Sequence, residues 1–368
     1  MEDRPIPMNG ENMEFENRKE ICILCHKREK DFSASSASVL CYECRLRQIK
    51  LNIPPKIKLF LAAVCTIFLL SLILLVPVLS SYQNYLDAEK HMKAKEFSFA
   101  YDKYSVILGK YNFGVPLILK TADAAVSAQY FGELAELLDT YLVGKKLNDS
   151  EYAKAMKYSD FLSAYAETYE AIDNIFTEAN DAAVTQEDAE DAAHIALPLI
   201  YQKLEALLLE ESLDKTLIYF YLGNLSQDSK TAIEYLKLSV EQNAICTYVY
   251  SFYGSALRRG GEFDQARQVY QTALALNACD ALSWRGLGIL QLLEGQNSLG
   301  LEFIQHAYII EPNGLYVPEA LVIALCENGL RDDAMAFLGQ LIADGFQVEE
   351  DFQEYIDGNI SLKQYYLD

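Results

Sequence analysis

The chain has little of what enzymatic chemistry needs. Only four histidines occur in 368 residues, and none of them stands in a pattern with a nucleophile. The phosphate-binding loop GxxxxGK(S/T), the GxSxG elbow and the HExxH zinc motif are all missing. The sequence therefore predicts a protein that is not an enzyme.

Signals for β-strands are also scarce. No run of alternating apolar and polar residues is long enough to indicate a strand. From Ser81 onward, glycine and proline are few and fall between segments of helical periodicity. These patterns predict an all-α fold.

Positive charge is scarce in the C-terminal part. Residues 1–56 carry 10 Lys and Arg against 9 Asp and Glu, which nearly cancel. Residues 82–368 carry 20 Lys and Arg against 44 Asp and Glu, a formal charge of −24. An acidic surface of this size repels phosphate backbones, so nucleic acid is an unlikely partner for this part of the chain.

Cysteines are concentrated near the N-terminus. Cys65, Cys246, Cys279 and Cys326 stand alone, which indicates buried apolar positions and no disulfide framework. The other four form two CxxC pairs separated by fifteen residues: Cys22, Cys25, Cys41 and Cys44. Two such pairs predict a tetrahedral zinc site, and four thiolate ligands leave the metal no open position for a substrate. We expect a structural zinc ion in a module at residues 21–50, with His26 as a bystander.

This module resembles small zinc-ribbon or treble-clef domains. Its size leaves no room for a core, so its folding would depend on the metal. Two roles remain open. The module can dock against a protein, or it can contact nucleic acid through its basic residues, although Glu20, Glu29, Asp31 and Glu43 interleave with them.

One long segment carries no charge. The 21 residues Leu59–Leu79 would form a helix about 31 Å long, which matches a hydrocarbon core of roughly 30 Å. A buried core helix would show a polar face, and a signal peptide would have a shorter apolar core. We predict a disordered tail at 1–20, a hinge at 51–58 and a transmembrane helix at 59–80.

Flanking charge predicts the orientation in the membrane. The fifteen residues before Leu59 contain five Lys and Arg, whereas Ser80–Ala94 contains only Lys90 and Lys93. This bias places the N-terminus in the cytoplasm and the C-terminal domain on the extracytoplasmic side. A reducing compartment also suits a cluster of thiolates.

The C-terminal domain, residues 81–368, shows a period of 34 residues. Ala232, Ala266, Gly300 and Ala334 follow it, as do Gly261, Gly295 and Gly329. Trp284, Leu287 and Gly288 have the spacing W-x2-L-G. In both period and residue types the domain resembles the tetratricopeptide repeat (TPR), a helix–turn–helix unit that stacks into a solenoid.

The clearest repeats are 247–280, 281–314 and 315–348, and the segment at 214–246 is degenerate. A further repeat is expected at 81–114 and a weaker one at 116–143, whereas residues 150–211 are helical without a match. The number of repeats in 115–246 stays open.

The resemblance implies a concave groove lined by the first helix of each repeat. In this register the groove-facing residues are Tyr248, Phe252, Arg258, Arg259, Arg285 and Ile289. Three arginines in an acidic domain predict a site for a carboxylate or an acidic peptide. The alternative is that they neutralise acids of the domain itself, such as Glu262 and Asp264.

Together these features predict a membrane-anchored scaffold for protein–protein interaction. Its repeat domain would bind a protein or peptide partner outside the cytoplasm, and its zinc module would be structural. The alternative is a membrane-tethered regulator whose zinc module contacts nucleic acid or a cytoplasmic regulatory protein.

Overall fold

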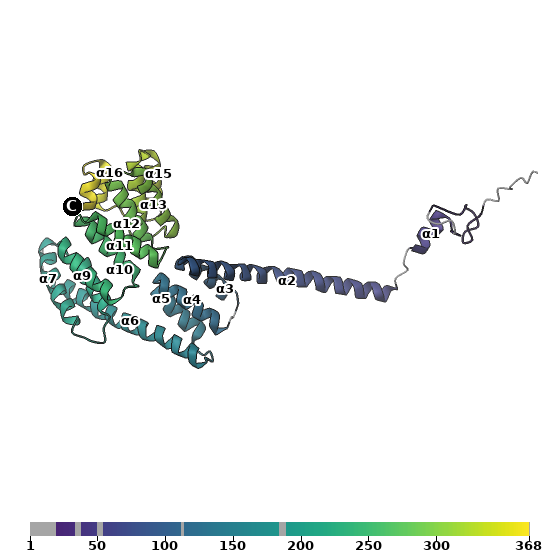
Figure 1. Ribbon diagram of the computed structural model, residues 1–368, viewed down its shortest axis with the longest axis horizontal. Coiled ribbons are helices and arrows are strands. Elements are labelled where there is room, and N and C mark those ends of the chain that lie inside the picture. Colours follow the sequence, from purple (N-terminus) through teal and green to yellow (C-terminus); the bar gives the residue numbers. More distant parts are fainter. Residues whose placement is uncertain (1–19, 34–37, 50–53, 112–113, 184–188, 368) are drawn as a thin grey trace, which may run out of the picture. The chain divides into compact units, whose positions relative to one another are not determined.

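The computed structural model describes residues 20–33, 38–49, 54–111, 114–183 and 189–367. The chain divides into two compact units, Met1–Pro77 and Val78–Asp368 (Figure 1). The predicted tail at 1–20 lies outside the described residues except for Glu20, and so do residues 51–53 of the predicted hinge.

The first unit contains the cysteine segment and the short helix α1 (Tyr42–Ile49). Backbone bonds hold the segment together, among them Cys22 N–H to the Arg28 carbonyl at 2.8 Å and Asp31 N–H to the Leu40 carbonyl at 2.9 Å. One isolated antiparallel bridge joins Ile21 to Glu29. The described residues contain no β-strand.

Helix α2 (Pro55–Ala94) is 40 residues long and contains the whole uncharged segment. It begins before the predicted transmembrane boundary and continues beyond it. By length and composition α2 can cross a membrane, and the side chains of its most apolar stretch are not buried by other parts of the protein. The residues from Val78 to Ala94 belong to the second unit, where Ala88 is fully buried.

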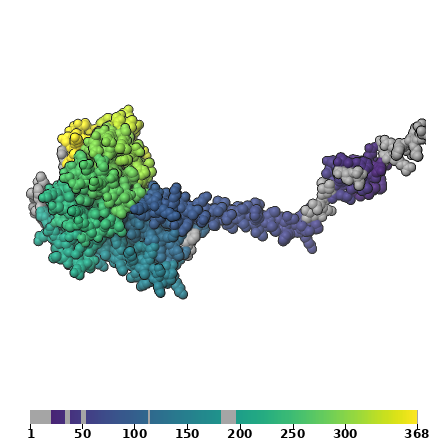
Figure 2. Space-filling view, viewed as in Figure 1, coloured from purple at the N-terminus to yellow at the C-terminus, as the bar shows by residue number. Residues whose placement is uncertain are grey.

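The second unit consists of helices joined by turns in its described part, and Figure 2 shows its atoms packed into one continuous body. After α2 the elements are α3 (Phe97–Leu108), α4 (Val115–Ala128), α5 (Phe131–Leu137), the π-helical turn η1 (Leu138–Leu142), α6 (Asp149–Ala183), α7 (Ala189–Leu207), α8 (Lys215–Asn224) and α9 (Ser229–Gln242). The C-terminal half contains α10 (Thr247–Arg259), α11 (Phe263–Leu276), α12 (Ala281–Leu293), α13 (Asn297–Ile310), α14 (Val317–Glu327), α15 (Arg331–Ala343), α16 (Glu350–Asp357) and α17 (Leu362–Leu367).

The fold is an all-α, TPR-like helical solenoid. The pairs α10/α11, α12/α13 and α14/α15 coincide with the three clearest sequence repeats. The turns inside these pairs use glycine with positive φ, at +81° for Gly261, +78° for Gly295 and +74° for Gly329. Residues with a side chain rarely adopt this left-handed backbone conformation, which explains why glycine recurs there every 34 residues.

Small residues allow neighbouring helices to approach closely. The ring of Tyr270 in α11 is fully buried between Gly254 of α10 and Gly286 of α12. A Cβ atom would lie 2.5 Å from the ring at Gly254 and 2.3 Å from it at Gly286. Only glycine fits at these two positions without displacing the ring.

The first helix pairs contact the C-terminal repeats through their turns. Lys95, between α2 and α3, has φ +60°, and its carbonyl accepts a hydrogen bond from Ala278 N–H at 3.0 Å. Gln129, between α4 and α5, has φ +64° and binds Thr247 Oγ1 at 2.7 Å and Tyr248 N–H at 3.1 Å. The solenoid therefore bends so that its first turns meet the linkers that flank α10 and α11.

Candidate functional site

The structure brings the four predicted cysteine ligands together. The sulfur atoms of Cys22, Cys25, Cys41 and Cys44 all lie within 4.8 Å of one another, and Cys25 Sγ is 3.8 Å from Cys41 Sγ. Four sulfurs at the usual zinc distance of about 2.3 Å would lie about 3.8 Å apart at the corners of a tetrahedron. His26 is exposed and is not part of the cluster.

The thiols strongly influence one another. Burial acts to raise the pKa of Cys22, but backbone hydrogen bonds at Cys41, Cys25 and Leu24 prevail and lower it to about 6. Burial, followed by hydrogen bonds with the other three cysteines, raises the pKa of Cys44 to about 12. Thiolates this close together repel one another, and a divalent cation bound by all four would offset that repulsion, so these residues fit a tetrahedral divalent metal.

Carboxylates pair with much of the basic charge around the cluster. Arg28 pairs with Glu43, Lys30 Nζ lies 2.7 Å from Glu20, and Arg45 lies 2.6 Å from Asp31. The exposed surface of the same unit is rich in large apolar side chains, namely Ile21, Ile23, Leu24, Phe32, Val39, Tyr42 and Leu46.

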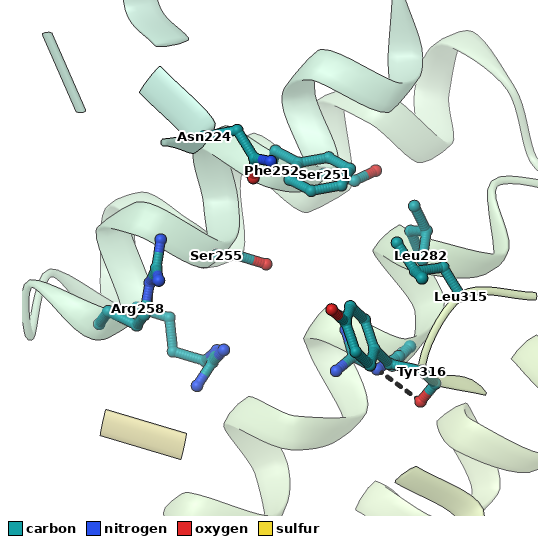
Figure 3. Close-up of a pocket in the computed structure, with 10 residues that line it drawn as sticks. Asn224, Ser251, Phe252, Ser255, Arg258, Leu282, Leu315 and Tyr316 are labelled. Atoms are coloured by element: carbon teal, nitrogen blue, oxygen red, sulfur yellow. Dashed lines mark hydrogen bonds between the residues drawn. The ribbon is translucent and has the colours of Figure 1, made fainter. Parts of the chain in front are cut away.

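A second candidate site is a cavity of about 340 Å³ in the C-terminal half, which we call the arginine cavity. Its lining comes from α8, α10 and α12 and from the segment before α14: Asn224, Ser251, Phe252, Ser255, Arg258, Arg259, Leu282, Arg285, Leu315 and Tyr316. The close-up in Figure 3 shows Arg258 and Tyr316 pointing into the same space from different segments.

Arg258 is only 5% exposed, and the C-terminal helix α17 covers it. Its guanidinium donates to the Tyr366 carbonyl and lies 5.2 Å from the centre of the Tyr366 ring. Its Nε is buried without a hydrogen-bond partner among the described residues. Burial lowers the pKa of Arg258, and the charge of Arg285 lowers it further, so the two guanidiniums are close enough to repel.

Arg285 lines the cavity from α12. Its Nε donates to the Tyr316 carbonyl at 2.9 Å, the bond drawn as a dashed line in Figure 3, and its guanidinium lies 5.3 Å from the Tyr316 ring centre. Burial raises the pKa of nearby Glu319 to about 7, so this carboxyl is only partly charged at neutral pH.

Among the residues that the structure describes, no carboxylate lies within 4.0 Å of Arg258, Arg259 or Arg285. In particular, the described ion pairs do not join these arginines to Glu262 or Asp264. The cavity is therefore a local excess of positive charge inside a domain of strongly negative net charge.

Two of the six predicted groove residues lie elsewhere. Ile289 is fully buried in the apolar core that α12 forms with α14, so it has no surface to offer a partner. Tyr248 packs edge-to-face on Phe220 with ring centres 5.0 Å apart and lines a different cavity, of about 370 Å³. The 34-residue register correctly places both residues on the first helix of a repeat. It cannot predict which neighbouring side chains cover them.

Tyr316 lines the arginine cavity and Tyr366 contacts its residue Arg258, but neither tyrosine was predicted from the sequence. Tyr316 has φ +57°, a left-handed conformation that a bulky side chain rarely adopts, and the sequence gives no sign of it. Tyr366 lies outside the repeats, two residues from the C-terminus.

No family model matches the chain. A 112-residue stretch, 30% of this chain, is 30% identical to the cell division cycle protein 27 homolog of Caenorhabditis elegans. The match covers 14% of that protein, so the chain spans about one seventh of the length of this relative.

Solved structures of MamA are also similar in part. One aligns with 43% of this chain and 95% of its own length, at 22% identity and a TM-score of 0.33. A second aligns with 52% of this chain and 98% of its own length, at 20% identity and a TM-score of 0.32.

Proposed function

We propose that the chain is a membrane-anchored scaffold whose repeat domain binds an acidic segment of a protein partner. The observation that carries the proposal is the arginine cavity, which three arginines line without an ion pair to a carboxylate in the described part of the chain, and two of them are close enough to repel. Like charges at close range are costly unless an anion lies between them. A carboxylate would form charge-assisted hydrogen bonds with guanidinium groups, and Phe252 and Leu315 offer apolar contact beside them.

The three arginines have different parts in this proposal. Arg258 donates a hydrogen bond to α17. It therefore holds the cavity wall in place and also adds positive charge to the cavity. Arg259 is exposed, and Arg285 uses its Nε for Tyr316, which leaves its terminal nitrogens for a ligand. We therefore assign direct contact with the acidic segment to Arg259 and Arg285.

We propose that the four cysteines hold a structural zinc ion. The sulfur separations support this assignment, because four sulfurs this close together match a tetrahedral site around one divalent cation. A bound ion would supply the folding energy that so small a unit lacks. The exposed apolar side chains around it suit docking to a protein.

Membrane anchoring through α2, with the zinc module in the cytoplasm and the repeat domain outside it, completes the proposal. Support comes from the length and hydropathy of α2 and from the excess of positive charge before Leu59. The nucleic-acid alternative has less support, because Arg28, Lys30 and Arg45 are already paired with carboxylates.

The arginine cavity can be tested with the full chain in detergent. The probe is a library of fluorescent hexapeptides with Asp or Glu at half of the positions, compared with its Asn and Gln counterpart. We expect binding of the acidic library only. Each charge-assisted bond contributes about 1.5–3 kcal/mol, so the double variant Arg259→Ala, Arg285→Ala should lose at least about tenfold in affinity.

Arg267→Ala is the matched control, because this guanidinium pairs with Glu294 outside the cavity. The control should bind like the unmodified chain. Equal binding by the double variant and the control would refute the assignment of the cavity to an acidic ligand.

The zinc assignment requires a separate measurement. Metal analysis of the full chain should find one zinc per chain, and Cys44→Ser should reduce it strongly. Cys65→Ser and His26→Ala, which change a lone cysteine and the neighbouring bystander, should retain it. Metal-free chains in which residues 21–49 stay protected from proteolysis would exclude a structural role for zinc.

A further inference from the structure

The repeat domain contains an apolar cavity where the uncharged part of α2 ends. It has a volume of about 470 Å³, within the usual range of small-molecule sites. From α2 it is lined by Val78, Tyr82 and Tyr85, and the α2 side of the wall also includes Ser81. No charged side chain of the described residues lines it.

The opposite wall comes from the next helices of the same unit. Ile107 lies in α3, Tyr111 follows α3, and Leu117 lies in the first turn of α4. Ile107 is 2% exposed, whereas Tyr111 and Leu117 are partly exposed. The cavity is therefore enclosed by three segments and does not lie on a flat face.

The wall formed by Tyr85 is held in place from outside. Lys120 Nζ donates to the Tyr85 hydroxyl at 2.8 Å and also pairs with Glu89. The Tyr85 ring packs on Tyr104 with centres 6.0 Å apart. With its hydroxyl bonded to Lys120, Tyr85 offers the cavity its ring, so the interior suits a hydrocarbon better than a polar ligand.

The position of the cavity along α2 indicates its occupant. The apolar stretch ends at Leu79, one residue after the first lining residue, Val78, and polar residues follow from Ser80. Tyr85 lies six residues further, which is about 9 Å along a helix. The headgroup region of a bilayer leaflet is roughly 5–8 Å deep, so the cavity would begin at the hydrocarbon boundary and end near the headgroups. Tyrosines are enriched at this depth in membrane proteins.

We propose that this cavity binds one acyl chain of a membrane lipid, with the headgroup left in the interfacial layer. The proposal rests on the proposed membrane anchoring by α2 but is independent of the zinc site and of the arginine cavity. The acyl chain would cover the apolar lining of the cavity and would hold the repeat domain at the bilayer surface.

The test uses the full chain in lipid nanodiscs that contain a phosphatidylcholine with a diazirine near the end of one acyl chain. After irradiation, adducts are mapped by mass spectrometry. We expect adducts on α2 and also on Ile107, Tyr111 or Leu117, which do not belong to the membrane helix. Val78→Trp should reduce the second group to background by filling the cavity.

Leu79→Trp is the matched control. Leu79 is 51% exposed and Val78 is 53% exposed on the same helix, but only Val78 lines the cavity. The control should leave the adducts on Ile107, Tyr111 or Leu117 unchanged.

Each other outcome has a definite meaning. Adducts confined to Leu59–Leu79 would show a membrane helix and an acyl-free cavity, which overturns this inference alone. Adducts nowhere on the chain would refute the membrane anchoring itself. Adducts on Ile107, Tyr111 or Leu117 that survive Val78→Trp would also overturn the acyl-chain assignment.

Discussion

The turns in the C-terminal repeats and those in the first helix pairs share a backbone conformation but not a residue type. Gly261, Gly295 and Gly329 adopt positive φ, and a Cβ atom added at any of them would meet nothing within 4 Å. Lys95 and Gln129 adopt positive φ with full side chains, and those side chains bind the C-terminal half of the domain. A turn with glycine serves only its own repeat, whereas a turn with a side chain accepts backbone strain and makes a long-range contact.

The strongest way to break the regular repeats is to add volume at a helix contact. Gly286→Ala would place a Cβ atom 2.3 Å from the buried ring of Tyr270. Overpacking of this kind costs about 1–3 kcal/mol of unfolding free energy. Trp284, the only tryptophan, lies on the same helix and reports unfolding in denaturant by its fluorescence. An unchanged midpoint would mean that the ring moves freely, contrary to its full burial.

The next effect concerns the glycine turns. Gly295→Ala meets no neighbour, so its cost is the left-handed backbone alone, about 1–2 kcal/mol. Asparagine tolerates this conformation better, so Gly295→Asn should cost less than Gly295→Ala in the same denaturation assay. Equal costs for the two variants would show that the loss does not come from backbone strain.

A smaller effect is expected at the turns of the first helix pairs, where the residue with positive φ carries a side chain. Gln129→Gly relieves the strain but removes the bonds to Thr247 and Tyr248, worth about 0.5–1.5 kcal/mol each. The domain should lose about 1 kcal/mol of stability in total. The Tyr248 amide should also exchange hydrogen faster, because it loses its acceptor. Gln129→Glu keeps an acceptor for this amide and should keep its protection. Unchanged exchange in Gln129→Gly would show that the long-range contact does not form.

The smallest effect should have the opposite sign. Gly339 lies inside α15, is exposed, and an added Cβ atom there would meet nothing within 4 Å. Gly339→Ala should stabilise the domain by about 0.5–1 kcal/mol, because alanine has the higher helix propensity. A loss of stability in denaturant would indicate that this glycine makes a contact in the folded protein.

The sequence predicted the structural features that recur in every repeat and depend only on nearby residues. The 34-residue period located the glycine turns and the pairs α10/α11, α12/α13 and α14/α15, because a turn with positive φ selects glycine whatever surrounds it. The positive φ of Lys95 and Gln129 could not be predicted, because it depends on contacts 116 to 183 residues away in the chain. Tertiary contacts override local preference at these positions.

The candidate sites divide in the same way. The sulfur cluster follows from two CxxC turns, and its residues are close in sequence. The arginine cavity depends on packing between repeats, so Arg258, Arg259 and Arg285 were found from their register, but the burial of Ile289 under α14 was not. The contact of Arg258 with Tyr366 joins residues 108 apart, and no periodic pattern extends to α17.

The shared ring of Tyr270 has a consequence for how the solenoid unfolds. This single side chain is the packing partner of Gly254 in one repeat and of Gly286 in the next. Neither repeat can open without exposing the ring, so the two should melt as one cooperative unit. In a stack where each repeat contacts only its neighbours, such a joint suppresses partly unfolded species at its position. Fraying would then begin at the ends of the array, and the walls of the arginine cavity that α10 and α12 form would lie within its most persistent part.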